Sequence, residues 1–176
     1  MELLEYRVRA VTAGVGEVET RPTGTEATSF AGSETLQSSH VTNLDGFMKT
    51  YLNPGTLAHN PAFSQAIVVE GPAKTIYVGG QNAVAADGTI VGDTLAEQSS
   101  QAIANVQAAL AAAGATLHDV VRWTVAIVQG QSLRDGFAAF QAAWGDAPDP
   151  PTVTVYVVAG LANPRFLIEI DAIAAC

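Results

Sequence analysis

The stretch TLAEQSSQAIANVQAALAAAG, residues 94–114, is the clearest structural signal in the sequence. It predicts a long helix, and the other elements can be placed around it. Thr94 and Glu97 have the spacing of a capping box, and Gly114 supplies a C-terminal stop. The apolar positions of this helix form a narrow stripe made up of Leu95, Ala102, Val106, Ala109 and Ala113. The helix therefore has one narrow side that fits against a sheet.

Short runs rich in β-branched residues flank this helix and predict strands. The runs are residues 64–71, 74–80, 119–129, 152–160 and 166–174. The turn signal Gly71-Pro72-Ala73 predicts that the first two strands form a hairpin. The run 119–129 is long and mostly apolar, so we expect its strand to lie in the centre of a sheet.

A second helix is predicted over residues 132–145, with Ser132 as its cap. Its apolar residues recur at steps of four, three and four and are Leu133, Phe137, Phe140 and Trp144. The order β-β-α-β-α-β-β predicts an α+β fold, a single mixed β-sheet with both helices packed on one face. The other face of the sheet still carries apolar residues, so we expect an oligomer.

Residues 1–47 differ from the rest of the chain in amino-acid composition. They are rich in Ser, Thr, Gly and Glu and show no sustained period, so they bury little apolar surface. We expect a disordered or loosely attached N-terminal extension over 1–47 and a folded domain over 48–176. The alternative is a segment that docks on the domain, with residues 1–11 as one strand.

Composition excludes several classes of function. The 176 residues carry a net charge of -9 and eight basic residues, which argues against nucleic acid as a partner. Cys176 is the single cysteine, and no histidine pair has metal-ligand spacing, so we expect no metal and no cofactor. We expect no membrane partner either, because no apolar run approaches the roughly 20 residues of a span. A cytoplasmic protein is the default.

Several stretches together resemble one known family. They are NPAFSQAIVV (60–69), YVGGQ (77–81), residues 96–127 and IEIDAIA (168–174), and they are similar to the Rid family of reactive intermediate deaminases, also called YjgF. The likeness covers roughly residues 48–174. It implies a chorismate-mutase-like fold and a homotrimer that assembles through the sheets, with three ligand clefts between subunits. It also implies hydrolysis of reactive enamines and imines with release of ammonia.

The resemblance also implies which residues line the cleft, and here the chain departs from the family pattern. Val153, in Pro150-Pro151-Thr152-Val153, stands where active members carry the arginine that clamps a substrate carboxylate. The family's cleft tyrosine is replaced by Phe63, and its acidic element after the central strand by the stretch that contains Gln131. Gly80 keeps the family's Gly-Gln corner, and Val155 is expected to line the cleft. Arg165 is a weaker candidate for holding an anion.

Glu169 has two interpretations. From the strand alone, Glu169 and Asp171 alternate with apolar residues, which is typical of a solvated face. The resemblance instead makes Glu169 the catalytic residue, a general base that activates water, and leaves Asp171 at the surface. We therefore expect a deaminase-type hydrolase of enamines or imines whose cleft is too apolar for typical imino acids. The alternative is a non-catalytic trimer that binds a small metabolite or a protein partner.

Overall fold

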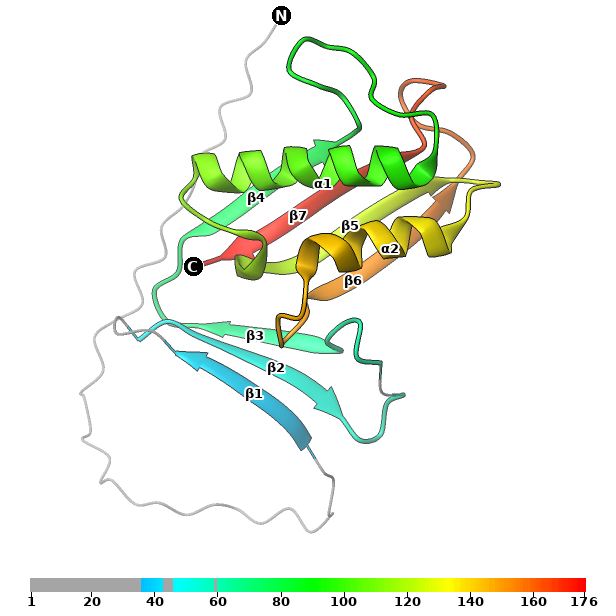
Figure 1. Cartoon of the computed structure of the whole chain (residues 1–176). Helices are drawn as coiled ribbons and strands as arrows, with labels where there is room; N and C mark the ends of the chain where they lie inside the picture. The colour runs from blue at the N-terminus through cyan, green and yellow to red at the C-terminus, as the bar shows by residue number, and fades with distance from the viewer. Residues whose placement is uncertain (1–35, 43–45, 59) are drawn as a thin grey trace, which may run out of the picture. The chain divides into compact units, whose positions relative to one another are not determined.

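The computed structural model describes residues 36–42, 46–58 and 60–176. Its described elements are two α-helices, one short 3-10 helix, η1 (Leu117–Asp119), and seven strands divided between two sheets (Figure 1). The α+β class, the mixed sheet and the two predicted helices are confirmed. Within the described residues, no helix combines the length and the apolar character needed to cross a lipid bilayer.

The first sheet contains β1 (Leu36–Thr42), β2 (Met48–Pro54) and β3 (Ala66–Glu70) in that order, with both pairings antiparallel. β1 lies within the segment 1–47 that was expected to be an extension, yet it pairs with β2 along its whole length, from Leu36 opposite Pro54 to Thr42 opposite Met48. The folded part of the chain therefore reaches back at least to Leu36. The strand considered for residues 1–11 lies outside the described residues.

The second sheet contains β4 (Thr75–Gln81), β5 (Val120–Val128), β6 (Thr152–Val158) and β7 (Ile168–Ala175). Its order is β4-β7-β5-β6, as the ribbon shows (Figure 1). β5 pairs antiparallel with β7 and parallel with β6, so the sheet is mixed and β5 is an inner strand, as predicted.

The predicted hairpin over 64–80 is wrong, and the described strands form a three-stranded antiparallel sheet in addition to the predicted mixed sheet. β3 pairs with β2, whereas β4 pairs with β7, so the chain changes sheets between Glu70 and Thr75. Two features of the connection explain the change. Gly71 has a left-handed φ of 84°, and Pro72 has no N–H to donate to a ladder. Lys74 then exchanges backbone hydrogen bonds of 2.8 and 3.2 Å with Cys176, which starts the pairing with β7.

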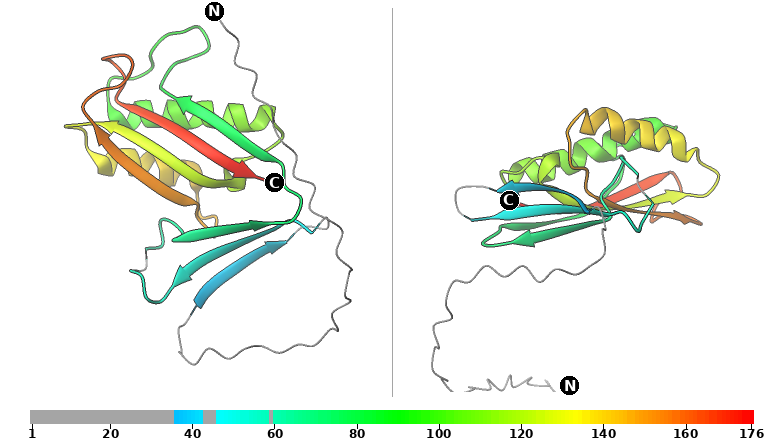
Figure 2. Two further views of the ribbon diagram at one scale, coloured as in Figure 1. Left: turned by 180° about the vertical axis from the view of Figure 1, so that it is seen from behind. Right: turned by 90° about the horizontal axis from the view of Figure 1, so that it is seen from below.

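Both helices, α1 (Leu95–Ala112) and α2 (Leu133–Trp144), cover the same face of the four-stranded sheet, as the view from below shows (Figure 2). The predicted capping box is confirmed, because the Glu97 N–H donates to Thr94 Oγ1 at 3.3 Å and the Thr94 N–H donates to Glu97 Oε2 at 3.0 Å. Ser132 occupies the N-cap of α2, but its side chain makes no capping hydrogen bond.

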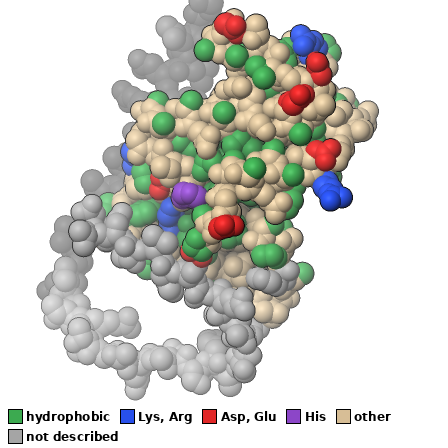
Figure 3. All heavy atoms as spheres, in the orientation of Figure 1, with side chains coloured by type: hydrophobic (Ala, Val, Ile, Leu, Met, Phe, Trp, Pro, Cys, Tyr) green, Lys and Arg blue, Asp and Glu red, His purple; other side chains and the backbone are tan. Residues whose placement is uncertain are grey.

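The core lies between the helices and this sheet. Along β7 the side chains alternate, with Ile168, Ile170 and Ala172 buried under the helices and the residues between them less buried. The buried side of α1 is wider than the predicted stripe, because it also contains Gln98, Ser99, Ile103 and Leu110. Apolar atoms show between the helices in the space-filling view, while charged side chains lie around the edge of this face (Figure 3).

Candidate functional site

A cavity of about 660 Å³ lies on the helix-bearing side of the four-stranded sheet. Its walls come from β5, β6, β7, both helices and the loop 60–63, and its lining residues are Asn60, Pro61, Ala62, Phe63, Ser99, Ile103, Trp123, Val125, Ile127, Leu133, Gly136, Phe137, Phe140, Gln141, Val153, Val155, Ile168 and Ile170. Among the described residues, none that lines this cavity is charged. Its size is in the range typical of small-molecule sites.

Three of the predicted site residues, Phe63, Val153 and Val155, line this cavity together. Val153 stands opposite Trp123 in the parallel pairing of β6 with β5, so it shares the helix-bearing face with that buried ring. Val155 is 49% exposed and lies nearer the mouth. The structure therefore puts hydrocarbon at the position for which the resemblance implies an arginine.

Glu169 and Gly80 lie together on the opposite face of the same sheet. Glu169 alternates with Ile168 and Ile170, which face the cavity, so its side chain leaves the sheet on the other side. A Cβ added at Gly80 would lie 2.5 Å from Glu169 Oε1, so the missing side chain makes room for the carboxylate. The predicted residues thus form two groups on two faces.

A β-bulge explains why Gly80 faces Glu169. Val78 pairs with Ala172 and Gln81 with Ile170, so three steps along β4 match two steps along β7. The extra residue turns Gly80 away from the face that the side chain of Val78 occupies. Asn82 follows the bulge, and its Nδ2 donates to the Ile168 carbonyl oxygen at 2.9 Å and to Glu169 Oε2 at 3.3 Å. The Asn82 amide therefore orients the carboxylate beside Gly80.

Gln131 and Arg165 lie apart from both groups. Gln131 is half-buried in the turn before α2 and does not line the cavity. Arg165 is exposed, and its guanidinium lies 3.8 Å from the carboxylate of Asp93 at the surface. The weaker hypothesis that Arg165 holds an anion in the cleft therefore has no support from its position.

Sequence reasoning missed Asn82, Ser99 and Trp123. Asn82 directly follows the Gly-Gln corner, so its short amide at a strand end was a usable signal. Ser99 and Trp123 line the cavity and are 1% and 2% exposed. Within the described part of the chain, neither Ser99 Oγ nor Trp123 Nε1 has a hydrogen-bond partner. No sequence pattern distinguishes them from ordinary residues of a helix and a strand.

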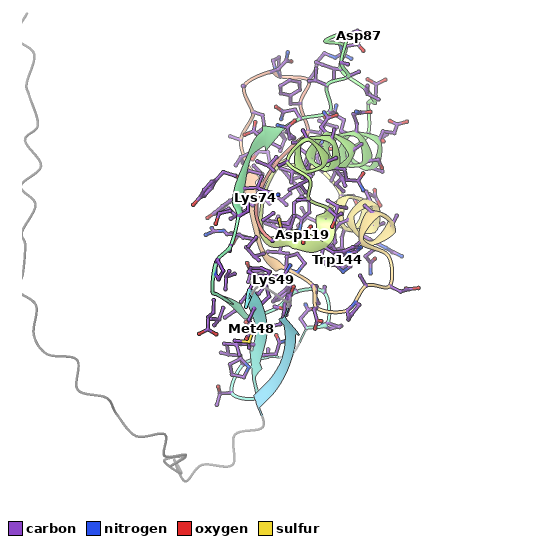
Figure 4. All side chains as sticks on the ribbon, turned by 90° about the vertical axis from the view of Figure 1, so that its left-hand side faces the viewer. Met48, Lys49, Lys74, Asp87, Asp119 and Trp144 are labelled. Atoms are coloured by element: carbon purple, nitrogen blue, oxygen red, sulfur yellow. The ribbon has the colours of Figure 1, made fainter. Side chains whose placement is uncertain are left out.

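A second polar cluster lies at the start of β5. Lys49 of β2 is 4% exposed, its Nζ donates to the His118 carbonyl oxygen at 3.1 Å, and it lies 3.8 Å from Asp119 (Figure 4). Burial lowers the pKa of the Lys49 ammonium, and the charge of Asp119 opposes that shift. The described residues contain no group of three or more His, Cys, Asp or Glu side chains that could hold a metal ion. This cluster connects β2 to the segment that precedes β5.

The chain is thus an α+β protein with two helices on one face of a mixed sheet. It has a carboxylate against a Gly-Gln corner on one face of that sheet and a cavity on the other. The chain belongs to the family described as endoribonuclease L-PSP, also known as YjgF or Rid, whose model matches residues 56–176. Among solved structures, a Rid-family protein of unknown function from Yersinia pestis is 32% identical, with a TM-score of 0.66 over 73% of this chain and 98% of that one.

Two further relatives extend this comparison. A YjgF-family member from Mycobacterium tuberculosis is 30% identical, with a TM-score of 0.51 over 64% of this chain and 86% of that one. TdcF from E. coli, solved with bound serine, is 26% identical, with a TM-score of 0.54 over 58% of this chain and 80% of that one. No functionally curated protein matches the sequence significantly.

Proposed function

We propose that this protein is a homotrimeric hydrolase of reactive enamines or imines in which Glu169 activates water. The observation that carries the proposal is the position of the Glu169 carboxylate, which lies against Gly80 and accepts a hydrogen bond from Asn82. The missing side chain at Gly80 makes room for the carboxylate, which in this position can take a proton from water. The serine bound to the TdcF relative supports small-molecule binding in this family.

The two groups of site residues are best explained by a site between copies. The sheet itself separates Glu169 from the cavity, so one copy cannot bring them to the same substrate. The face that carries Glu169 also carries Tyr77, which is 78% exposed, and Tyr156, which is 52% exposed. We assign this face to the trimer interface. The Glu169 and Gly80 of one copy would then meet Phe63, Val153 and Val155 of its neighbour.

In the proposed reaction the Glu169 carboxylate removes a proton from water as the oxygen attacks the C=N carbon. A C–O bond forms, and the π electrons move to nitrogen, which takes up a proton. Collapse of this carbinolamine breaks the C–N bond, so the products are ammonia and a carbonyl compound. An enamine enters the same route after protonation on carbon. The reaction consumes one water and needs no metal or cofactor.

The substrate class follows from the cavity. Since no described lining residue is charged, a substrate carboxylate would lose hydration without gaining an ion pair. Apolar contact with Phe63, Val153 and Val155 favours an uncharged imine instead. Gln131 is proposed as a polar contact at the edge of the assembled cleft.

The test compares two imines generated in situ by oxidases. Iminopropionate is made from alanine and phenylacetaldimine from phenethylamine, and ammonia release is followed with and without the protein. We expect acceleration for the uncharged imine and little for iminopropionate. Glu169→Gln should lower the accelerated rate roughly 10²–10⁴-fold. Asp171→Asn, on the same strand and face, is the matched control and should keep the rate.

Three results would contradict parts of this proposal. Equal rates for Glu169→Gln and the wild type would remove Glu169 as the base. Strong acceleration with iminopropionate would refute the interpretation of Val153. A monomeric mass by light scattering would exclude a site assembled from two copies.

A non-catalytic trimer that binds a small metabolite or a protein partner is the second candidate. The uncharged lining of the cavity favours it, because binding of an apolar molecule needs no reactive group. Tight binding of an uncharged ligand together with no acceleration of either imine would support this function over hydrolysis.

A further inference from the structure

The cavity ends in two polar groups that the proposed reaction does not use. The Ser99 hydroxyl of α1 and the Trp123 indole N–H of β5 both line it, and both residues are at least 98% buried. Neither group has a hydrogen-bond partner among the described residues. Burying such groups costs free energy unless they are hydrogen-bonded, so their common position in one cavity points to a ligand.

The Ser99 hydroxyl lies between the helices, beside the cavity. Gly136 of α2 faces it, because a Cβ added there would lie 3.5 Å from Ser99 Oγ and 3.2 Å from Leu95 Cδ2. A larger residue at position 136 would press into the space between the helices. Gly136 itself lines the cavity. The small residue therefore lets the two helices approach. Ser99 Oγ and Trp123 Nε1 each expose less than 1 Å², so a ligand reaches them when the side chains around the closed end shift.

The two ends of the cavity differ in exposure. Leu133 and Phe137 are 49% and 43% exposed, so they lie at the mouth, whereas Ser99 and Trp123 lie at the closed end. The wall between the ends is aromatic, since Phe140 stands edge-to-face with Trp123 at 5.9 Å and stacks with Phe137 at 6.3 Å. Such a wall suits a flat apolar ligand body.

The chemistry of the closed end selects the polar part of the ligand. An indole N–H only donates, and a hydroxyl can also donate, so a hydrogen-bond acceptor satisfies both. A charged acceptor is disfavoured, because no described residue of the lining carries a charge to offset its lost hydration. A neutral carbonyl oxygen meets both conditions.

We propose that this cavity binds a neutral, largely apolar molecule whose carbonyl-type acceptor is hydrogen-bonded by Ser99 Oγ and Trp123 Nε1 at the closed end. The inference rests on the proposed function in one respect, because Phe63, Val153 and Val155 of its substrate-binding region line the same cavity. Binding at the closed end does not require Glu169, because Glu169 of the same copy lies on the other face of the sheet and does not line the cavity.

The experiment measures equilibrium binding to the full chain by isothermal titration calorimetry, with three probes of one shape. The probes are 4-phenylbutan-2-one, butylbenzene, which lacks the carbonyl oxygen, and 3-phenylpropanoate, which replaces the acetyl group with a carboxylate. We expect the ketone to bind at least 10-fold more tightly than the carboxylate. Ser99→Ala and Trp123→Phe should each weaken ketone binding roughly 5-fold and leave butylbenzene unchanged, because one neutral hydrogen bond is lost.

Matched variants separate this inference from the proposed hydrolysis. Ser100→Ala removes the neighbouring hydroxyl, which is exposed and donates to the Ala96 carbonyl oxygen at 3.0 Å, and it should bind all probes as the wild type does. Glu169→Gln should also keep ketone binding. If ketone binding persists while no imine is hydrolysed, the hydrolysis proposal fails and this one stands.

Two outcomes would overturn the inference. If no probe binds to the folded wild type, the cavity is not a site for this class of ligand. If the ketone binds but Ser99→Ala and Trp123→Phe weaken ketone and butylbenzene equally, the two groups do not recognise the carbonyl. Circular dichroism melting of each variant checks that it is folded.

Discussion

Replacing Gly80 with alanine tests whether the position of the Glu169 carboxylate matters separately from its presence. The new Cβ would lie 2.5 Å from Glu169 Oε1, 2.8 Å from Cδ and 3.0 Å from Cγ. Ordinary contact begins at 3.4 Å, so the oxygen must retreat by about 1 Å. The hydrogen bond from Asn82 is already 3.3 Å long and would not survive that shift.

The effects on stability and on activity should differ in size. All three crowded atoms belong to the end of a flexible, half-buried side chain, so the clash is relieved by a rotation rather than by a backbone shift. The cost of overpacking should stay near 1 kcal/mol, at the low end of the usual range. The loss of glycine's extra chain entropy offsets part of this cost. A base displaced by about 1 Å should lower the rate of imine hydrolysis roughly 10²-fold.

Stability is measured by urea unfolding and activity by ammonia release from phenylacetaldimine. Gly79→Ala is the matched control, because nothing lies within 4 Å of a Cβ added at that position. We expect both variants to lose little stability and only Gly80→Ala to lose activity. Equal activity for the two variants would refute the idea that the glycine corner positions the carboxylate. A loss above about 3 kcal/mol for Gly80→Ala would show that the carboxylate cannot move aside.

Three further predictions test other parts of the chain. Val153→Arg should raise the rate with iminopropionate at least 10-fold if the site is otherwise intact, and an unchanged rate in the ammonia assay would count against the assigned cleft position. Burial lowers the pKa of Lys49, so just below pH 10.5 the folded state binds fewer protons than the unfolded state. The free energy of unfolding of the wild type should therefore rise relative to that of Lys49→Met as the pH rises toward 10.5. A difference between the two proteins that does not change with pH in urea unfolding would contradict this. Thr94→Ala should lower the free energy of unfolding by about 1 kcal/mol, measured by urea unfolding, through loss of the α1 cap, whereas no change would mean that the capping box adds nothing.

The helices and most strands could be predicted because their signals are local. The Thr94 cap, the stop at Gly114 and the alternation along β7 each involve residues a few positions apart. The prediction of a hairpin over 64–80 was wrong because it relied on a local turn signal. The backbone of Lys74 instead pairs with Cys176, which is distant in the sequence. β1 was missed because its polar composition carries no hydrophobic period, and it becomes a strand by pairing with β2.

Some residues of the candidate site could likewise be predicted from the sequence, whereas others could be found only from the structure. The sequence pattern and the family resemblance singled out Glu169, Gly80, Val153 and Val155 residue by residue and placed them in a cleft between subunits. Within one copy, Glu169 and Gly80 lie on one face of the sheet, whereas Val153 and Val155 line the cavity on the other. Leu133 and Phe137 matched an apolar helix face, yet the structure leaves them half-exposed at the mouth of the cavity. Ser99 carries no signal of its own, because a serine in a helix is usually solvated and its burial depends on α2 packing beside it.

The sequence by itself determined the two helices, the α+β class and the family, because each depends on residue identity or short-range spacing. Only the tertiary structure decided that Gly80 and Glu169 share one face while the cavity opens on the other. That arrangement depends on one bulged residue in the pairing of β4 with β7 and on a contact between Asn82 and Glu169, which are 87 positions apart. Strand register over such a separation is set by the packing of the whole sheet, so no local pattern encodes it.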